Sequence, residues 1–431
     1  MSEKPMTLER PARLKTLVGA PTFTHAPGDT PGTAIDRATR IAKQAEALKV
    51  TGFFTADVLH ADLAGVTGNT GTQEPLITLA ALSQHTSHIG LVATLSTTFA
   101  DPYNIARLVG TLDHVSGGRA AWNAVTSSVG EENFGGDLPT PEERYDRARE
   151  FIEVINALYD GLPADASKRG PRGVNVDQRR LKRISHTGRH FRIAGPLNIA
   201  PLPQRRPVQW QAGQSEPGVR LGAELAEVVY TSQPTLPQAI EFATRLRALA
   251  RDAGRQGLPF IMNSLHSLIG EDEADVARRQ REKHEKIDYD GGRLKLADML
   301  GGDLDLSDLP LDRPLPENLL PDVNAVNRRR GRVDIFVRFA RQGLTLRELI
   351  QQAQETGHWN VAGTPEQIAD AVKERFDAGV LNVMTLHGLG NPDQEDLLVN
   401  GLIPELRKRN LLDDDYVEGG FRANLGLPAL G

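Results

Sequence analysis

Residues 116–127 read SGGRAAWNAVTS, and this stretch decides the fold. A Gly-Gly turn and one basic residue precede a short run that is small and apolar except for one amide, Asn123. A turn followed by such a run is typical of a parallel strand buried on both faces. The run ends in hydroxyls at Thr126 and Ser127. An α/β barrel binds ligands at the carboxyl ends of its strands, so this end is a candidate site. The alternative is a buried strand with a polar end.

Strand-like runs of this kind alternate with amphipathic helical stretches along most of the chain. Eight strands are predicted over residues 14–20, 52–56, 89–94, 119–125, 208–212, 228–231, 260–269 and 381–386. Helices are predicted over residues 34–49, 75–84, 102–115, 141–159, 236–254 and 363–379, and another begins at residue 215. This alternation predicts a parallel sheet, and eight strands predict a (β/α)8 TIM-type barrel.

Two insertions interrupt the predicted barrel, and residues 1–431 are expected to form one domain around them. The first insertion, at about 160–207, is rich in Pro, Gly and Arg and is expected to contain a hairpin. The second, at about 275–360, is expected to hold a helix near 344–356. Its segment 275–340 is rich in Asp, Leu and Pro and poorly periodic, which is typical of a mobile lid.

The composition excludes several classes of protein. The chain has no cysteine, which rules out disulfides, thiolate metal ligands and a thiol nucleophile. Its formal net charge of −6 gives no bias toward nucleic acid, and the arginine-rich run at 328–332 is expected to be a solvated face. The chain has no stretch near 18 consecutive apolar residues, and its amino terminus is polar. We therefore expect no membrane span, no secretory signal and a cytoplasmic location.

The predicted strand ends collect side chains that are polar and mostly uncharged. They carry Thr22, His25, Asp57, His60, Thr94, Thr97, Asn123, Thr126, Ser127, Ser215, Thr231, His266 and His387. This rim lacks the paired carboxylates of a glycosidase and any obvious cluster of metal ligands. It suits a planar cofactor that forms hydrogen bonds. His25 and His60 are the ionisable candidates beside it, and the alternative is that each is only a polar neighbour.

The segment QWQAGQSEPG, residues 209–218, predicts a binding site for phosphate. A strand leads into Gly213, where the missing side chain lets backbone N–H groups approach an anion. Ser215 adds a hydroxyl at the start of a helix, whose amino end favours negative charge. The alternative is that Ser215 only caps this helix.

Motifs along nearly the whole chain, these two segments included, resemble the luciferase-like flavin monooxygenases. More narrowly, they are similar to the large subunits of the nitrilotriacetate monooxygenase, pristinamycin IIA synthase and dibenzothiophene sulfone monooxygenase group. The matching stretches are FFTADVL (53–59), residues 74–107, LDHVSGGRAAWNAVTS (112–127), ENFGGD (132–137), and residues 143–160, 186–218, 226–239 and 363–379. In this combination and order the motifs are highly specific for that group of enzymes.

The resemblance implies a barrel that binds reduced FMN, which a separate NAD(P)H:flavin reductase supplies. Oxygen adds at C4a of the flavin, and the resulting hydroperoxide oxygenates a small organic substrate. By motif, the expected FMN contacts are Asp57, Thr94 or Thr97, Tyr145, Gly213 and Ser215, with Asn123 and Thr126 on the same face. The candidate catalytic residues are His25, His60, Asn123 and Ser127. No metal is expected, and we expect a homo-oligomer, a dimer or a tetramer.

Two departures from the family pattern affect the expected flavin site. The family often has a histidine four residues before the tyrosine of ERY, and here that position is Pro141, so one flavin contact is lost or replaced. Many relatives have AGSSE where this chain has Gln214 in place of the first serine.

Two alternatives to a two-component monooxygenase stay open, and a cofactor-binding assay would separate them. They are a deazaflavin-dependent oxidoreductase of the same superfamily and a non-catalytic flavin-binding subunit.

We expect the chain alone not to oxidise NAD(P)H efficiently, because no dinucleotide fingerprint of the form G-x-G-x-x-G follows any predicted strand. The purified protein should bind reduced FMN more tightly than oxidised FMN and should need an added flavin reductase for turnover. The measurement is NAD(P)H consumption in the presence of FMN, with and without the reductase. Efficient oxidation without the reductase would contradict the two-component interpretation.

Overall fold

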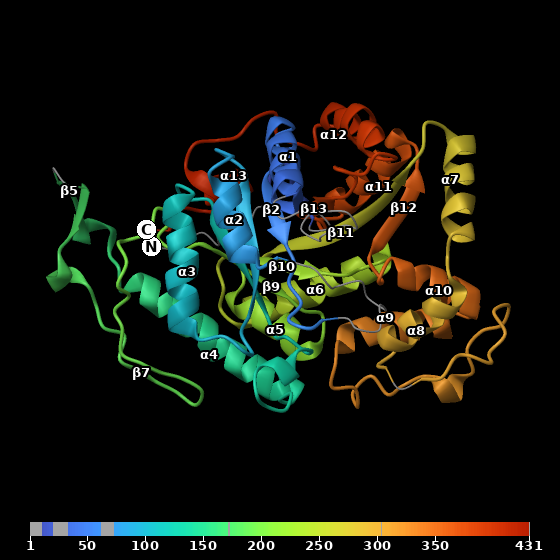
Figure 1. Ribbon diagram of the computed structural model, residues 1–431, viewed down its shortest axis with the longest axis horizontal. Helices are drawn as coiled ribbons and strands as arrows, with labels where there is room; N and C mark the ends of the chain where they lie inside the picture. The colour runs from blue at the N-terminus through green and yellow to red at the C-terminus, as the bar shows by residue number, and fades with distance from the viewer. Residues whose placement is uncertain (1–10, 20–32, 62–72, 171–172, 303, 431) are drawn as a thin grey trace.

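Eight parallel strands close into a barrel with helices around it (Figure 1). The computed structural model describes residues 11–19, 33–61, 73–170, 173–302 and 304–430. The strands are, in order around the barrel, β1 (Lys15–Val18), β2 (Gly52–Thr55), β3 (Gly90–Ser96), β4 (Ala120–Val125), β9 (Val208–Ala212), β10 (Val228–Thr231), β11 (Phe260–Ile269) and β13 (Val383–Leu386). Pairing of β13 with β1 completes the ring. The predicted (β/α)8 TIM-type barrel is confirmed.

Helices follow the strands and cover the outside of the barrel. They are α1 (Thr33–Ala47), α2 (Pro75–Ser83), α3 (Pro102–Val115), α4 (Pro141–Asp160), α5 (Glu216–Leu225), α6 (Leu236–Asp252), α11 (Pro365–Asp377) and α12 (Ile403–Lys408). Their starts have local causes in the sequence. Asp101 caps α3 by accepting a hydrogen bond from the Asn104 N–H at 3.1 Å. Thr364 and Gln367 form a capping box at α11. No helix in the described ranges has the length and apolarity needed to cross a bilayer.

The amino end of the barrel is filled by a side chain from the carboxyl-terminal helix α13 (Gly420–Leu425). Phe421 is fully buried and its ring stacks on Trp210, with centroids 6.5 Å apart. Gly90 begins β3 directly beside this ring, and a Cβ atom there would lie 2.1 Å from Cδ2 of Phe421. Glycine is therefore required at this position for the ring to enter the barrel. The interior above Phe421 is apolar and includes Met262.

The first insertion contains two antiparallel hairpins. One pairs β5 (Ser167–Gly170) with β6 (Gly173–Val176), and the other pairs β7 (His186–Thr187) with β8 (Arg192–Ile193). A hairpin was expected in this insertion, and the second of the two has its turn between His186 and Phe191. His186 and His190 bond to acidic side chains of α4, to Glu150 at 2.8 Å and to Asp146 at 3.1 Å respectively.

The second insertion has more regular structure than its sequence predicts. It contains α7 (Glu273–Glu285), α8 (Tyr289–Met299), α9 (Arg330–Arg341), α10 (Leu346–Gln354) and β12 (Trp359–Gly363). Helices α8, α9 and α10 pack around Phe336, Leu296 and Leu349 in an apolar cluster of their own. Strand β12 extends the sheet by pairing in parallel with the outer half of β11. Weak periodicity in this segment is explained by short helices, with a long Pro-containing connection between α8 and α9. Closure as a lid stays a prediction.

Substitution Gly90→Ala should destabilise the protein, because the added methyl group overlaps the Phe421 ring. We expect the free energy of unfolding to fall by about 1–3 kcal/mol. In a Phe421→Ala background the same substitution should cost much less, since the two positions share this contact. Urea denaturation midpoints measure both costs. Gly136→Ala is the control, because no atom lies within 4 Å of its added Cβ. Equal costs of Gly90→Ala in the two backgrounds would contradict this account of the barrel end.

Candidate functional site

The carboxyl end of the barrel is polar because the side chains that point inward there are polar. Val92 of β3 and Ala121 of β4 belong to the apolar interior. Every second residue beyond them faces the same way. The inward positions at the carboxyl ends are Thr94, Ser96, Asn123, Tyr230, Ser232, Ser264, His266, Thr385 and His387. The barrel mouth is therefore a ring of hydroxyl, amide and imidazole groups.

Asn123 and Thr94, both predicted site residues, lie together at this mouth. They occupy paired positions of β4 and β3, and the Asn123 side-chain N–H donates to the Thr94 hydroxyl at 3.1 Å. The Oδ1 atom of Asn123 is buried and has no hydrogen-bond partner among the described residues. A buried carbonyl oxygen without a partner costs free energy, so this atom is suited to accept from a bound ligand.

The hydroxyl groups of Thr97 and Ser127 form hydrogen bonds within the segments that follow β3 and β4. The Thr97 hydroxyl donates to the Val125 carbonyl at 3.1 Å, and the Ser127 hydroxyl donates to Ser96 at 2.9 Å. Both groups therefore stabilise the polypeptide around the mouth. Thr126, which directly follows β4, lines a cavity of about 280 Å³ where β4, β9 and β10 end.

This cavity, here named the cradle cavity, brings together Tyr145, Gly213 and Ser215 as the sequence predicted. Ser215 holds the N-cap position of α5, but its side chain makes no capping bond. Its hydroxyl instead donates to the Tyr145 hydroxyl at 3.3 Å. Added Cβ atoms at Gly213 and Gly218 would lie 3.2 and 2.8 Å from that tyrosine oxygen, so both glycines make room for it. The Ser215 hydroxyl is therefore not used to cap α5, and with the Tyr145 hydroxyl it lines the cavity at the start of this helix.

The arginine-rich run was expected to be solvated, and this expectation is wrong for part of it. Arg329, Arg330 and Arg332, at the start of α9, line the cradle cavity opposite Ser215. Arg330 pairs with Glu142 at 2.8 Å. The Nη1 atom of Arg332 is buried without a hydrogen-bond partner among the described residues. Burial lowers the pKa of Arg332 to about 10, so it stays a cation at neutral pH.

The insertion is fixed to the barrel next to this cavity. Arg144 of α4 donates from Nη1 to the Asn327 side-chain oxygen at 3.0 Å and from Nη2 to the Asn327 carbonyl at 2.8 Å. These bonds hold the start of α9, and with it Arg332, against α4. The local sequence gives no sign of this placement, because Arg144 and Asn327 are far apart in the chain.

The remaining predicted residues lie around the mouth or outside the described residues. Burial, reinforced by the charge of Glu74, raises the pKa of Asp57 to about 6. His60 is half exposed and its Nδ1 bonds to Glu132 at 2.6 Å, so the structure does not bring it into the cradle cavity. His25 lies outside the described residues.

Three histidines from distant segments meet at the barrel mouth. The ring of His266 lies 4.9 Å from that of His358 and 4.7 Å from that of His387, measured between centroids. Burial lowers the pKa of His387 to about 3 and that of His358 well below its usual value. Ser264 bonds to His387 Nε2 at 2.9 Å, and Ser232 bonds to His358 Nδ1 at 3.0 Å. Two neutral imidazoles therefore lie beside the site. In the described part of the chain no group of three or more His, Cys, Asp or Glu side chains could hold a metal ion.

Comparisons with known proteins agree with this geometry. The family model described as luciferase-like monooxygenase matches residues 16–382. N-acetyl-S-(2-succino)cysteine monooxygenase of Bacillus subtilis (strain 168) is 36% identical over 400 residues, which cover 91% of this chain and 90% of that protein. Nitrilotriacetate monooxygenase component A of Aminobacter aminovorans is 35% identical over 364 residues, which cover 82% of this chain and 79% of that protein.

The fold comparison gives the same result. A crystal structure of a riboflavin lyase, with modified FMN and the substrate riboflavin, superimposes with a TM-score of 0.81 and 27% identity. The superposition covers 97% of this chain and 96% of that one. These matches extend over most of the chain and confirm the resemblance found in the motifs. The chain belongs to the luciferase-like monooxygenase family and is a flavin-dependent monooxygenase.

Proposed function

We propose that this chain is the oxygenase component of a two-component monooxygenase that uses reduced FMN and O₂ to oxygenate a small organic substrate. A separate NAD(P)H:flavin reductase supplies the reduced FMN. The observation that carries this proposal is the cradle cavity, where the hydrogen-bonded hydroxyls of Ser215 and Tyr145 converge at a helix start with Arg332, whose buried Nη1 has no partner among the described residues. The name of one relative, component A of a monooxygenase, supports a partner protein.

The cradle cavity fits the phosphate of FMN. Ser215 and Tyr145 offer hydroxyl donors, and the amino end of α5 offers backbone N–H groups and a favourable dipole. Arg332 supplies a cation on the opposite wall, and a phosphate would give its buried Nη1 the partner it lacks. Pro141 also lines this cavity, at the position where the family often has a histidine. The arginines of α9 therefore replace the lost contact in this proposal.

The barrel mouth fits the ring system of the flavin. A flavin edge presents both N–H donors and carbonyl acceptors, and the unpartnered Oδ1 of Asn123 is suited to accept from it. Thr94 orients this amide. We assign Asp57 and Thr126, which follow β2 and β4, to the same side of the flavin. Reduced FMN, when bound, supplies the electrons that activate O₂.

In this proposal the side chains of the protein cover the reacting end of the site and transfer protons there. His358 and His387 are neutral beside the mouth, so each can relay a proton by accepting one at one ring nitrogen and releasing one from the other, which leaves no buried charge. Tyr230 stacks on His358 with ring centroids 5.9 Å apart, which fixes the imidazole and covers one face of it. We propose that this histidine cluster, more than His60, serves the reacting end of the site.

Substitution Ser215→Ala should weaken binding of reduced FMN by about 10- to 100-fold, because one charge-assisted hydrogen bond to phosphate is lost. Riboflavin, which lacks the phosphate, should bind the variant and the wild type equally. Quenching of tryptophan fluorescence under anaerobic conditions measures both affinities. Ser307→Ala, in an exposed loop, is the control. An unchanged FMN affinity, or an equal loss for riboflavin, would place the phosphate elsewhere.

Stability should fall as the pH drops from 6.5, because the unfolded chain protonates His387 in this range and the folded chain does not. One such group contributes a slope of up to about 1.4 kcal/mol per pH unit to the free energy of unfolding. His387→Gln should therefore reduce the loss of stability between pH 6.5 and 5. Urea denaturation at several pH values measures the slope, with His85→Gln in the exposed turn after α2 as control. An identical slope in His387→Gln and wild type would show that His387 is protonated in the folded protein.

A further inference from the structure

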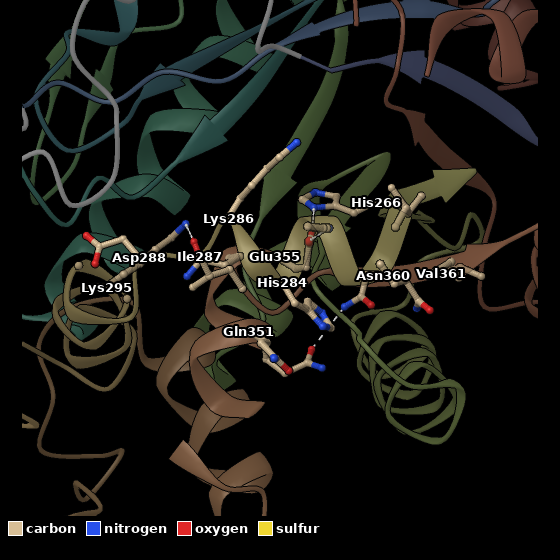
Figure 2. A pocket seen from close by; sticks show the side chains of 18 of the residues that line it. His266, His284, Lys286, Ile287, Asp288, Lys295, Gln351, Glu355, Asn360 and Val361 are labelled. Atoms are coloured by element: carbon tan, nitrogen blue, oxygen red, sulfur yellow. Dashed lines mark hydrogen bonds and ion pairs between the residues drawn. The ribbon is translucent and has the colours of Figure 1, made fainter. Parts of the chain in front are cut away.

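A second cavity, of about 600 Å³, lies beside the barrel mouth. Its walls are the outer parts of β11 and β12, the end of α7, the start of α8 and the end of α10 (Figure 2). It shares no lining residue with the cradle cavity, and its volume is in the range of small-molecule sites. We name it the lysine cavity, after Lys283, Lys286 and Lys295, which line it.

The carboxylates of the lysine cavity already have partners within the protein. Glu355 accepts from His266 Nδ1 at 2.8 Å through one oxygen and pairs with Lys283 through the other. Burial favours its protonated form, but these two partners lower the pKa of Glu355 to about 2. Asp288 caps α8 by accepting from the Asp290 N–H at 3.1 Å. Glu355 is close enough to Lys295 for its charge to raise the pKa of that lysine, but the two form no ion pair, because both Glu355 oxygens already have partners.

Two of the ammonium groups remain without a negative partner. Among the described residues, Lys286 and Lys295 form no ion pair. Within the described ranges the Lys295 ammonium donates one hydrogen bond, to the Gln354 side-chain oxygen at 3.4 Å. Burial lowers the pKa of Lys295, which shows that its charge is poorly solvated. An anion in the cavity would relieve that cost.

The other polar groups of the lysine cavity are amides, which suit oxyanions. They belong to Gln280, Gln351, Gln352, Gln354 and Asn360. Side-chain amides donate two hydrogen bonds each without adding charge. Figure 2 shows His266 and Asn360 at one side of the cavity, with Asp288 and Lys295 at the other. Donors on opposite walls favour a ligand with more than one anionic group.

A pair of imidazole rings lies between the lysine cavity and the proposed flavin site. His266 lines the lysine cavity and His358 lines the cradle cavity, and their ring centroids are 4.9 Å apart. A molecule held by Lys286 and Lys295 can therefore direct its other end toward His266, at the boundary between the two cavities.

We propose that the lysine cavity binds the carboxylates of the substrate, and that the substrate is a small polycarboxylate whose reacting atom lies at the boundary between His266 and His358. The second half of this statement rests on the proposed function. The binding of a polycarboxylate does not, because the lysine cavity contains none of the residues assigned to FMN.

The test is calorimetric titration of the full chain, without flavin, with succinate, tricarballylate and nitrilotriacetate. At least one of them should bind, and its methyl ester should not. Lys295→Met and Lys286→Met keep the length of the side chain and remove its charge, so each should weaken binding by about ten-fold or more. Lys373→Met is the matched control, because this lysine lies on α11 far from the cavity lining and loses the same charge. Two variants are used so that a folding defect in one does not decide the result.

Binding of reduced FMN is measured in the same proteins and should be equal in wild type and both variants. If none of the three acids binds, or if the ester binds as well, or if both lysine variants bind like Lys373→Met, the inference is wrong. FMN binding without polycarboxylate binding would overturn only this inference. Polycarboxylate binding without FMN binding would overturn the proposed function and leave the anion site standing.

Discussion

Closure of eight parallel strands is the constraint on which the rest of the molecule depends. In a closed barrel every second side chain of each strand points inward. The alternate residues of each strand therefore determine what fills the interior. Register then decides which inward groups are neighbours. Thr94 pairs with Asn123 across β3 and β4, and Ser264 pairs with Thr385 across β11 and β13. Both pairs form side-chain hydrogen bonds, at 3.1 and 2.6 Å. The polar mouth is thus a direct product of strand pairing.

The sequence predicted those parts of the structure that arise from local pattern. All eight barrel strands occur where short apolar runs were found, because parallel strands buried on both faces leave few polar residues in the run. Helix starts were predictable from caps such as Thr364. The convergence of Tyr145 with Ser215 came from a family motif and is confirmed as geometry. Their role toward a flavin stays a proposal.

The parts that could not be predicted come from contacts between distant segments. Arg332 was expected in solvent because a run of arginines has no apolar period of its own. Only the bonds between Arg144 and Asn327 show that it faces the cradle cavity. His358 gave no signal either, since it follows α10 in an insertion and meets His266 only when β12 pairs with β11. The insertion therefore supplies walls to both cavities, and its own apolar core around Phe336 keeps those walls in place.

The way this chain buries its sulfur atoms affects its resistance to damage. Reduced flavin that meets O₂ without substrate produces hydrogen peroxide, which oxidises cysteine and exposed methionine. The chain has no cysteine and only five methionines. Met262 and Met384 are fully buried beside the barrel interior, and Met299 is 4% exposed within the packed insertion. The packing that fills the barrel and the insertion therefore also shields these three thioethers from such an oxidant.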